Sequence, residues 1–243
     1  MKLAVVTGAS SGIGAATARL LLEQGWRVIA VARRGERLEA LGDGVVAVPV
    51  DLTDAGAPAR VRAAVEAEGG ALGLLVNNAG AEWRSTFGDG GYANVRQTMD
   101  VNFDAVVRLT EALLPRLRES APSSIVNVSS VAGRIARPSN SAYAASKFAL
   151  AGWTEAVSVE EQRNGVHVGQ VLPGFVSTEG FPHKRLKQSL RTRWLVSEPD
   201  KVARAILAAG PGGRHEVYVS RPYLFVPKLR HLFPRLTRRA LGG

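Results

Sequence analysis

Short apolar runs alternate with longer amphipathic segments along almost the whole chain. Seven runs are short and rich in Val, Ile and Leu, as buried strands are: residues 3–7, 27–31, 45–50, 74–77, 124–128, 166–171 and 215–219. Helical periodicity marks the segments between them: residues 13–24, 56–68, 94–118, 141–164 and 199–208. Such alternation is typical of βαβ units, so we predict an α/β fold with a doubly wound parallel sheet of about seven strands and helices on both faces.

Composition supports a single globular domain over residues 1–243. No internal repeat, low-complexity tract or Pro/Gly-rich linker divides the chain, and its 46% apolar and 21% charged residues are ordinary for a soluble domain. Cys is absent, which excludes disulfides and thiolate metal sites. Neither a signal peptide nor a stretch of transmembrane length is apparent, so we expect a cytoplasmic protein. Four histidines lack metal-ligand spacing, and no metal site is predicted: His167, His183, His215 and His231.

Positive charge is concentrated in the last quarter of the chain. The net charge is +10, yet residues 1–178 carry 17 Lys and Arg against 17 Asp and Glu. Residues 179–243 carry 14 against 4. This asymmetry indicates an anionic partner for the C-terminal part: a membrane surface, an acidic substrate or nucleic acid.

A glycine-rich turn follows the first predicted strand. Residues 7–14 read TGASSGIG, and a helical pattern follows directly. In a doubly wound sheet, ligands bind at the carboxyl ends of the strands, and glycines there let backbone N–H groups approach a pyrophosphate at a helix N-terminus. A glycine turn alone can be merely structural, but its position after the first strand favours a dinucleotide site.

The residues at the end of the second predicted strand indicate which dinucleotide the site binds. Folds that use NAD usually carry an acidic residue there, whereas Arg accommodates the 2′-phosphate of NADP. This chain has Ala32, Arg33 and Arg34 at that point, so NADP(H) is preferred over NAD(H). The alternative is that the two arginines only begin a solvated helix.

Tyr143 and Lys147 lie four residues apart in a helical pattern and so share one helix face. A free tyrosine has a pKa near ~10, too high for efficient proton transfer at neutral pH. A nearby ammonium, together with the positive nicotinamide of an oxidised cofactor complex, favours the phenolate and lowers that pKa, which predicts a tyrosine acting as acid and base. Such a pair is common by chance, so its weight depends on its neighbours.

Five motifs in this order resemble the short-chain dehydrogenase/reductase family, in its compact, single-domain, Rossmann-type branch. They are TGxxxGIG at residues 7–14, NNAG at 77–80, Ser130, Tyr143-x-x-x-Lys147 and Pro173-Gly174. The likeness runs from about residue 3 to about residue 219. It implies hydride transfer between a nicotinamide and a carbonyl or alcohol, catalysed by Asn102, Ser130, Tyr143 and Lys147.

The resemblance also implies a role for each of these residues. Ser130 would hydrogen-bond the substrate oxygen, Lys147 would hold the nicotinamide ribose, and Asn102 would anchor a water of the proton relay. The competing interpretation of Asn102 is a polar helix position that faces solvent. The neighbouring Ser129 can instead face the sheet and satisfy backbone groups.

The cofactor contacts implied by the family cover both ends of the cleft. Asp51 would reach the adenine edge, Asn78 and its neighbours would line the adenosine side, Val176 would meet the nicotinamide amide, and Thr178 would lie near the pyrophosphate. The full set is Gly8, Ser10, Ser11, Gly12, Ile13, Gly14, Arg33, Arg34, Asp51, Leu52, Asn78, Ala79, Gly80, Tyr143, Lys147, Pro173, Gly174, Val176 and Thr178. Structural alternatives are a helix cap at Asp51, Thr53 or Asp54, a supporting role for NNAG, and a plain turn at Pro173-Gly174.

Two C-terminal segments carry the excess charge. Residues 179–196 form the variable substrate segment of the family; if they are helical, Lys184, Lys187 and Arg191 share a face, as in a lid that favours a carboxylate, a phosphate or an acyl-carrier thioester. A solvated lid with incidental charge is the alternative. Residues 221–243 form a basic amphipathic tail whose apolar stripe is Leu229, Leu232, Phe233, Leu236 and Ala240. The tail either lies on an anionic bilayer or packs on the domain or on another subunit.

A second class of function has to be weighed against the enzyme. A non-catalytic NADP(H)-sensing or nucleic-acid-binding regulatory protein could use the same fold, and the positive charge agrees with it. Basic residues without interleaved aromatics are weak evidence for that, and no nucleic-acid partner is expected. A small carbonyl or alcohol substrate, anionic or lipid-like, is expected instead. The helices over 94–118 and 141–164 resemble those that pair subunits in the family, so a homodimer or homotetramer is expected.

Overall fold

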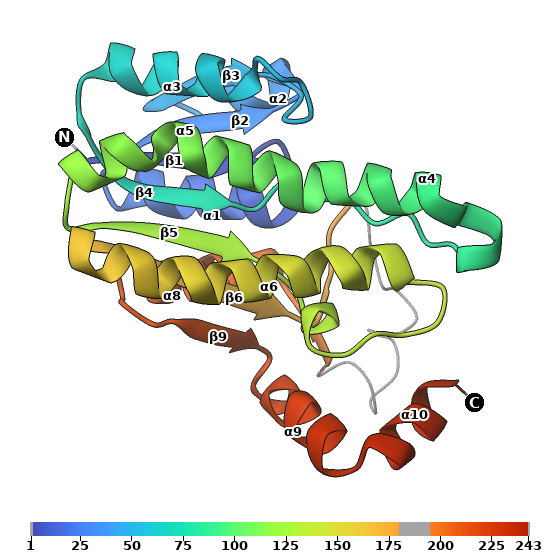
Figure 1. Ribbon diagram of the computed structural model, residues 1–243. Helices are drawn as coiled ribbons and strands as arrows, with labels where there is room; N and C mark the ends of the chain where they lie inside the picture. The colour runs from blue at the N-terminus through green and yellow to red at the C-terminus, as the bar shows by residue number, and fades with distance from the viewer. Residues whose placement is uncertain (1, 180–194, 243) are drawn as a thin grey trace.

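The computed structural model describes residues 2–179 and 195–242. A seven-stranded sheet runs through its centre in the order β3-β2-β1-β4-β5-β6-β9, and all paired strands are parallel (Figure 1). Its strands are β1 (Lys2–Thr7), β2 (Arg27–Ala32), β3 (Val45–Pro49), β4 (Ala71–Asn77), β5 (Ser123–Val128), β6 (Val166–Pro173) and β9 (Glu216–Val219). The predicted doubly wound α/β sheet is confirmed.

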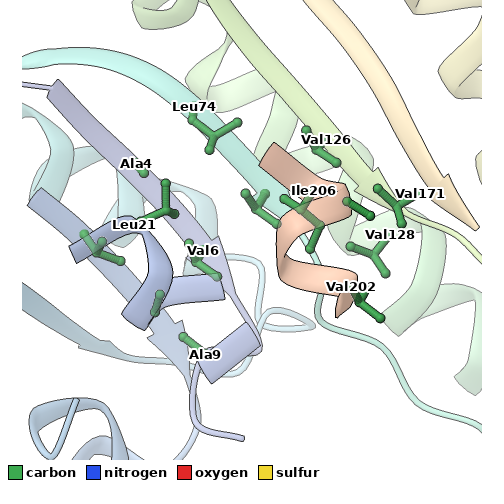
Figure 2. Packing of buried hydrophobic residues seen from close by; sticks show 14 of the residues in the cluster. Ala4, Val6, Ala9, Leu21, Leu74, Val126, Val128, Val171, Val202 and Ile206 are labelled. Carbon is green, nitrogen blue, oxygen red and sulfur yellow. The ribbon is translucent and has the colours of Figure 1, made fainter. Parts of the chain in front are cut away.

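Alternate residues of each strand feed two separate cores. Ala4 and Val6 of β1 belong to one core, whereas Leu3 and Val5 belong to the other, because successive side chains point to opposite faces. The first core is closed by α1 (Gly12–Glu23) and α8 (Pro199–Ala209), and Figure 2 shows Leu21 of α1 and Ile206 of α8 on that face. The second face carries α3 (Ala57–Glu68), α5 (Ala105–Glu119) and α6 (Ser141–Glu161).

The predicted helix over residues 94–118 is three elements in the structure. It is composed of α4 (Phe87–Met99), a π-helical turn (Asp100–Asp104) and α5. The helix begins earlier than predicted because Thr86 caps it, its side chain accepting a hydrogen bond from the Asp89 N–H. The π turn places Asn102 inside the protein with no exposed surface, so the solvent-facing interpretation of Asn102 is wrong.

Three short elements are not among the predicted strands and helices, although the first was weighed as an alternative at Arg33 and Arg34. They are α2 (Gly35–Glu39) and a two-stranded parallel sheet formed by β7 (Phe175–Val176) with β8 (Val196–Ser197). Each is too short to show a hydrophobic period. The proposed helical lid lies almost entirely in residues 180–194, outside the described residues.

The C-terminal tail is helical, as its periodicity predicts. It forms α9 (Phe225–Leu232) and α10 (Pro234–Gly242), with Pro234 starting the second helix. Leu229, Leu232, Phe233 and Leu236 are 49%, 67%, 50% and 63% exposed, so packing of this stripe on its own domain is wrong. Within the described part of the chain, no helix combines the length and the apolar character needed to cross a membrane.

A buried polar chain crosses the second face between the strands and the helices. The Asn77 amide Nδ2 donates to Asn127 Oδ1 at 2.9 Å and to Thr110 Oγ1 at 3.1 Å, and Asn127 Nδ2 donates to Thr154 Oγ1 at 2.8 Å. All four side chains are at most 2% exposed. These bonds fix α5 and α6 on the sheet, because an unpaired buried amide is costly.

Replacing Asn127→Ala is expected to lower the free energy of unfolding by about 1–3 kcal/mol, because it leaves a small cavity and removes a buried partner of Asn77. Urea unfolding followed by circular dichroism measures the change. Gln162→Ala removes an exposed amide and serves as the matched control, with an effect below about 0.5 kcal/mol. Equal losses in the two variants would contradict a structural role for the polar chain.

Candidate active site and cofactor cleft

The glycine turn after β1 needs glycine at specific positions. Gly8 and Gly12 have φ of +67° and +53°, in the left-handed region that favours glycine. At Gly14 a side chain would collide with the carbonyl oxygen of Gly8. The turn therefore packs tightly against the first turn of α1, whose N-terminal N–H groups face the carboxyl edge of the sheet.

Hydrogen bonds join the ends of β1 and β4, where the strand order reverses. The Thr7 hydroxyl donates to the Val76 carbonyl and accepts from the Asn78 and Ala79 N–H groups at 2.9 and 3.0 Å. The Asn78 amide donates to the Thr7 carbonyl at 2.8 Å. The Asn78 side chain thus supports the glycine turn from below, and its backbone neighbours line the cleft.

Arg34 directs its guanidinium over the glycine turn. Its Nη2 donates to Ser10 Oγ and Ser11 Oγ, both at 3.0 Å. Arg34 directly precedes α2, so the alternative that places the arginines at the start of a helix is correct for the backbone, whereas the side chain turns back to the cleft. One guanidinium, two hydroxyls and a helix N-terminus form a donor set that fits a phosphate.

Arg33 follows β2 and Asp51 follows β3, and the ends of these paired strands bring the two side chains together. Arg33 Nη1 lies 3.8 Å from Asp51 Oδ2, and Arg33 is largely exposed. Asp51 Oδ1 accepts from the Thr53 N–H and hydroxyl at 3.0 and 2.8 Å, and these bonds lower the Asp51 pKa. The N-cap of α3 is Gly56, so the predicted helix cap at Asp51, Thr53 or Asp54 is wrong.

Leu52 lies next to Asp51 and has a different environment. It is partly buried and packs against the second core. Its carbonyl lies 3.4 Å from Arg108 Nη2.

Ser130, Tyr143 and Lys147 meet at the carboxyl ends of β5 and β6. Tyr143 lies in the first turn of α6, and Lys147 Nζ is 5.7 Å from its ring centroid. The Ser130 hydroxyl, just past β5, donates to the Pro173 carbonyl at 3.5 Å and accepts from the Ala132 N–H at 3.1 Å, and it acts to lower the pKa of the Tyr143 phenol. Ser129 instead is buried and lies 3.3 Å from the Lys147 carbonyl, so it faces the interior.

Burial dominates the protonation of both titratable groups. Lys147 is 4% exposed, its Nζ donates to the Val128 carbonyl at 2.9 Å, and burial lowers its pKa to about 8. Burial likewise raises the pKa of Tyr143 to about 12; the hydrogen bond from Ser130 opposes this rise and the Glu82 carboxylate adds to it. Lys147 is not among the groups that shift the Tyr143 pKa in the protein by itself, and the lowering predicted for the complex with the oxidised cofactor stays a prediction.

The Asn102 side chain connects the π turn to the segment after β4 and to α6. Its Oδ1 accepts from the Ala81 N–H at 2.8 Å, and its Nδ2 donates to the Ala81 carbonyl and to Ser146 Oγ at 2.9 and 3.1 Å. Ser146 in turn donates to the Tyr143 carbonyl at 2.8 Å. At Gly80 a Cβ would lie 3.1 Å from Asn102 Oδ1 and 3.6 Å from Lys147 Nζ, so glycine lets these groups approach.

The segment after β6 closes the cleft from the other side. A side chain at Gly174 would overlap the Tyr223 ring, which lies across it. Val176 is buried in the first core, and Thr178 approaches the glycine turn, its Cγ2 3.0 Å from the position of a Cβ on Gly12. This segment is therefore more than a plain turn after Pro173.

Three residues near Tyr143 or near the segment after β6 were missed by the sequence reasoning. Glu82 and Arg137 both act electrostatically on Tyr143, and the Arg137 guanidinium stacks 5.1 Å from the Phe175 ring centroid. Tyr223 donates to the Leu195 carbonyl at 3.1 Å. None lies within a motif, and only the folded chain brings them together. No cluster of potential metal ligands occurs among residues 2–179 and 195–242.

Comparisons with known proteins agree with this geometry. The family model described as short chain dehydrogenase matches residues 2–189. The chain is 33% identical to the uncharacterized oxidoreductase YxnA of Bacillus subtilis, over 98% of this chain and 70% of that protein. It is 31% identical to the ketoacyl reductase HetN of Nostoc sp., over 90% and 79% of the two chains.

A solved structure extends the likeness to three dimensions. A short chain dehydrogenase from Burkholderia cenocepacia in complex with NADP superposes with a TM-score of 0.84 at 30% identity, covering 98% of this chain and 96% of that one. Fold, site geometry and sequence likeness agree over most of the chain. It belongs to the short-chain dehydrogenase/reductase family of oxidoreductases, whose fold binds a nicotinamide cofactor.

Proposed function

We propose that this chain interconverts a carbonyl and an alcohol with NADP(H), using Ser130, Tyr143, Lys147 and Asn102. The observation that carries the proposal is the convergence of Ser130, Tyr143 and Lys147: Ser130 acts on the pKa of the Tyr143 phenol, and the Lys147 ammonium lies 5.7 Å from the Tyr143 ring centroid. The bound cofactor supplies or accepts the hydride. The protein groups supply the proton and hold the substrate oxygen.

Tyr143 is the proton donor in the reductive direction. The phenol is protonated at neutral pH, because its pKa of about 12 lies far above 7, and it gives its proton to the substrate oxygen as negative charge develops there. Burial makes the phenol of the protein by itself a weak acid, so the positive charges of Lys147 and of the oxidised nicotinamide have to favour the phenolate during the transfer. Ser130 can donate to the same oxygen and stabilise that charge. Arg137 favours the phenolate that remains, and Glu82 disfavours it.

Lys147 and Asn102 complete the site: the first binds the cofactor ribose and the second positions its neighbours. The bond to the Val128 carbonyl uses one of three N–H donors of the Lys147 ammonium, which leaves donors for ribose hydroxyls. The Asn102 amide is bonded to Ala81 and Ser146, so we assign it the positioning of the π turn and of the relay water.

NADP(H) is preferred over NAD(H) because of the donor set at the end of β2. Arg34 with the Ser10 and Ser11 hydroxyls would take the 2′-phosphate, and the exposed Arg33 adds charge beside them. The NADP bound to the Burkholderia cenocepacia relative supports this choice. The other contacts that we propose are Gly8, Gly12, Ile13, Gly14, Asp51, Leu52, Asn78, Ala79, Gly80, Pro173, Gly174, Val176 and Thr178.

An enzyme explains the site better than the alternative, a sensor or a nucleic-acid-binding protein. A buried ammonium is costly to the fold, and a protein that only senses the cofactor has no need of the full set of Ser130, Tyr143, Lys147 and Asn102. HetN is named a ketoacyl reductase, which supports acyl thioesters as a substrate class to test first.

We also propose that subunits pair through the outer faces of α5 and α6. An open surface hollow between the π turn and α5 is lined by Thr53, Asp100, Phe103, Asp104, Val107 and Arg108, and Phe103 meets Trp153 of α6 edge to face. Apolar side chains bordered by charges of both signs are suited to a partner subunit.

Replacing Tyr143→Phe is expected to lower turnover by about 10²–10⁴-fold, because the proton donor is lost. The assay follows NADPH consumption against acyl thioesters, steroid ketones, quinones and small diketones. NADPH affinity should change little, and Tyr92→Phe, on an exposed tyrosine of α4, should keep full activity. If the wild type binds NADPH but consumes none with any of these substrates, the result favours the sensor. If it neither consumes nor binds NADPH, the cofactor assignment is overturned.

Replacing Arg34→Gln is expected to raise KM for NADPH by about 10–100-fold and to leave KM for NADH nearly unchanged, because only NADPH carries the 2′-phosphate. Initial rates with each cofactor measure the ratio. Arg37→Gln is the matched control, since Arg37 is already paired with Glu179 at 2.7 Å. A parallel rise for both cofactors would place the 2′-phosphate elsewhere.

Replacing Lys147→Met is expected to abolish turnover and yet stabilise the fold near neutral pH, by an amount on the order of 2 kcal/mol. Below about pH 8 the folded wild type holds a charged, desolvated lysine that the unfolded chain hydrates; above that pKa the lysine is neutral and the penalty fades. The advantage of the variant should therefore shrink as pH rises from 8 toward 10.5.

Urea unfolding of both proteins across that pH range measures the difference. Lys201→Met, at an exposed lysine of α8, should show no such pH dependence. A less stable Lys147→Met variant at neutral pH would mean that the ammonium stabilises the fold.

A further inference from the structure

The C-terminal arm, defined here as α9 and α10, presents large apolar side chains to solvent. Phe225 and the four residues of the tail stripe described above are all exposed, and α9 has no buried residue. Every residue from Lys228 to Leu236 is exposed. An apolar surface of this extent on the outside of a protein usually marks a binding surface.

The arm is held in place at the carboxyl edge of the sheet. It follows β9, which ends at that edge because it runs parallel to β6, and Figure 1 shows α9 and α10 apart from the helices that cover the sheet. Arg230 Nη1 donates to the Arg134 carbonyl at 2.6 Å, and the same guanidinium lies 5.3 Å from the Phe148 ring centroid. Arg134 follows β5, so the arm is tied to the substrate side of the protein.

The charge of the arm has a single sign. From Val217 to the last residue the chain has six Lys and Arg and no Asp or Glu. Lys228, Arg230, Arg235 and Arg239 are exposed on the arm itself, interleaved with the apolar residues. The ammonium of Lys228 lies 5.9 Å from the Phe225 ring centroid, so positive charge directly borders the apolar surface.

Two candidate occupants fit this surface less well. The arm's own domain leaves the apolar side chains exposed, as their accessibility shows. A second copy related by a two-fold axis would bring the same basic surface against itself, and like charges repel when desolvated. A partner that binds this surface therefore has to offer an apolar interior to the leucines and phenylalanines and negative charge to the lysine and arginines.

We propose that the C-terminal arm docks on the surface of an anionic lipid bilayer. Leu229, Leu232, Phe233 and Leu236 enter the boundary between headgroups and acyl chains, and the lysine and arginines contact the anionic headgroups. Docking by this arm turns the carboxyl edge of the sheet toward the bilayer. The inference does not depend on the reaction or on the choice of cofactor.

Flotation of the full chain with vesicles tests the apolar half of the surface. The vesicles are phosphatidylcholine alone, or phosphatidylcholine with about 30 mol% phosphatidylglycerol, which carries the negative charge. The wild type should float with the anionic vesicles, and the double variant Leu232→Ser/Phe233→Ser should partition at least about tenfold more weakly. Val159→Ser, which removes a 71% exposed apolar side chain from α6, should bind like the wild type.

A second pair of variants tests the charge. Lys228→Gln/Arg235→Gln should weaken binding to the anionic vesicles and flatten its dependence on salt. Arg19→Gln/Arg204→Gln removes the same charge from exposed positions on α1 and α8 and should leave binding unchanged. The mutated side chains are exposed, and unchanged circular dichroism and urea midpoints establish that each variant folds.

Three results would overturn the proposal. They are failure of the wild type to float with anionic vesicles, equal flotation of the Leu232→Ser/Phe233→Ser variant, and equal flotation with both kinds of vesicle. If the wild type fails to float and its oligomer dissociates in that variant, as light scattering after size exclusion would reveal, the arm binds a second copy of this chain.

Discussion

The reversal of strand order between β1 and β4 is the constraint on which the cleft depends. Connections from these neighbouring strands leave in opposite directions, so their carboxyl ends enclose an open crevice. The Thr7 hydroxyl closes its base through bonds to Val76, Asn78 and Ala79. Because that hydroxyl satisfies the backbone where the two strands part, the glycine turn can rise above the sheet without leaving buried polar groups unpaired.

The arrangement of the catalytic side chains lowers the stability of the fold. Lys147 is buried with one backbone carbonyl as partner, and burial moves its pKa and that of Tyr143 toward the neutral forms. Asn102 lies in a π turn, a helical irregularity that is seldom kept without a purpose. Its amide bonds to Ala81 and Ser146 compensate by connecting this turn to α6. The two hydrophobic cores below the cleft supply the stability that makes this arrangement tolerable.

The sequence predicts the sheet well because buried parallel strands are nearly continuous apolar runs, and all seven are found close to their predicted bounds. The sequence also predicts that Ser130, Tyr143 and Lys147 lie close together, since Ser130 follows a strand and the other two residues share a helix face. The π turn at Asn102 cannot be predicted from the hydrophobic pattern, because one extra residue in a turn barely disturbs the period of a long helix. The raised pKa of Tyr143 was equally inaccessible, since it comes from burial and from Glu82, which lies 61 positions away along the chain.

The asymmetry of charge along the sequence has a structural counterpart. The cores that stabilise the domain are formed by residues from Leu3 to Val219, and the arm beyond them contributes no side chain to either core. Repulsion among its arginines therefore acts outside the cooperative unit and costs the sheet little. Arg230 ties the arm to the domain through polar and stacking contacts, with the Arg134 carbonyl and the Phe148 ring. A segment so weakly coupled to the fold can keep exposed leucines and unbalanced charge at once, a combination that a binding surface explains and a folding requirement does not.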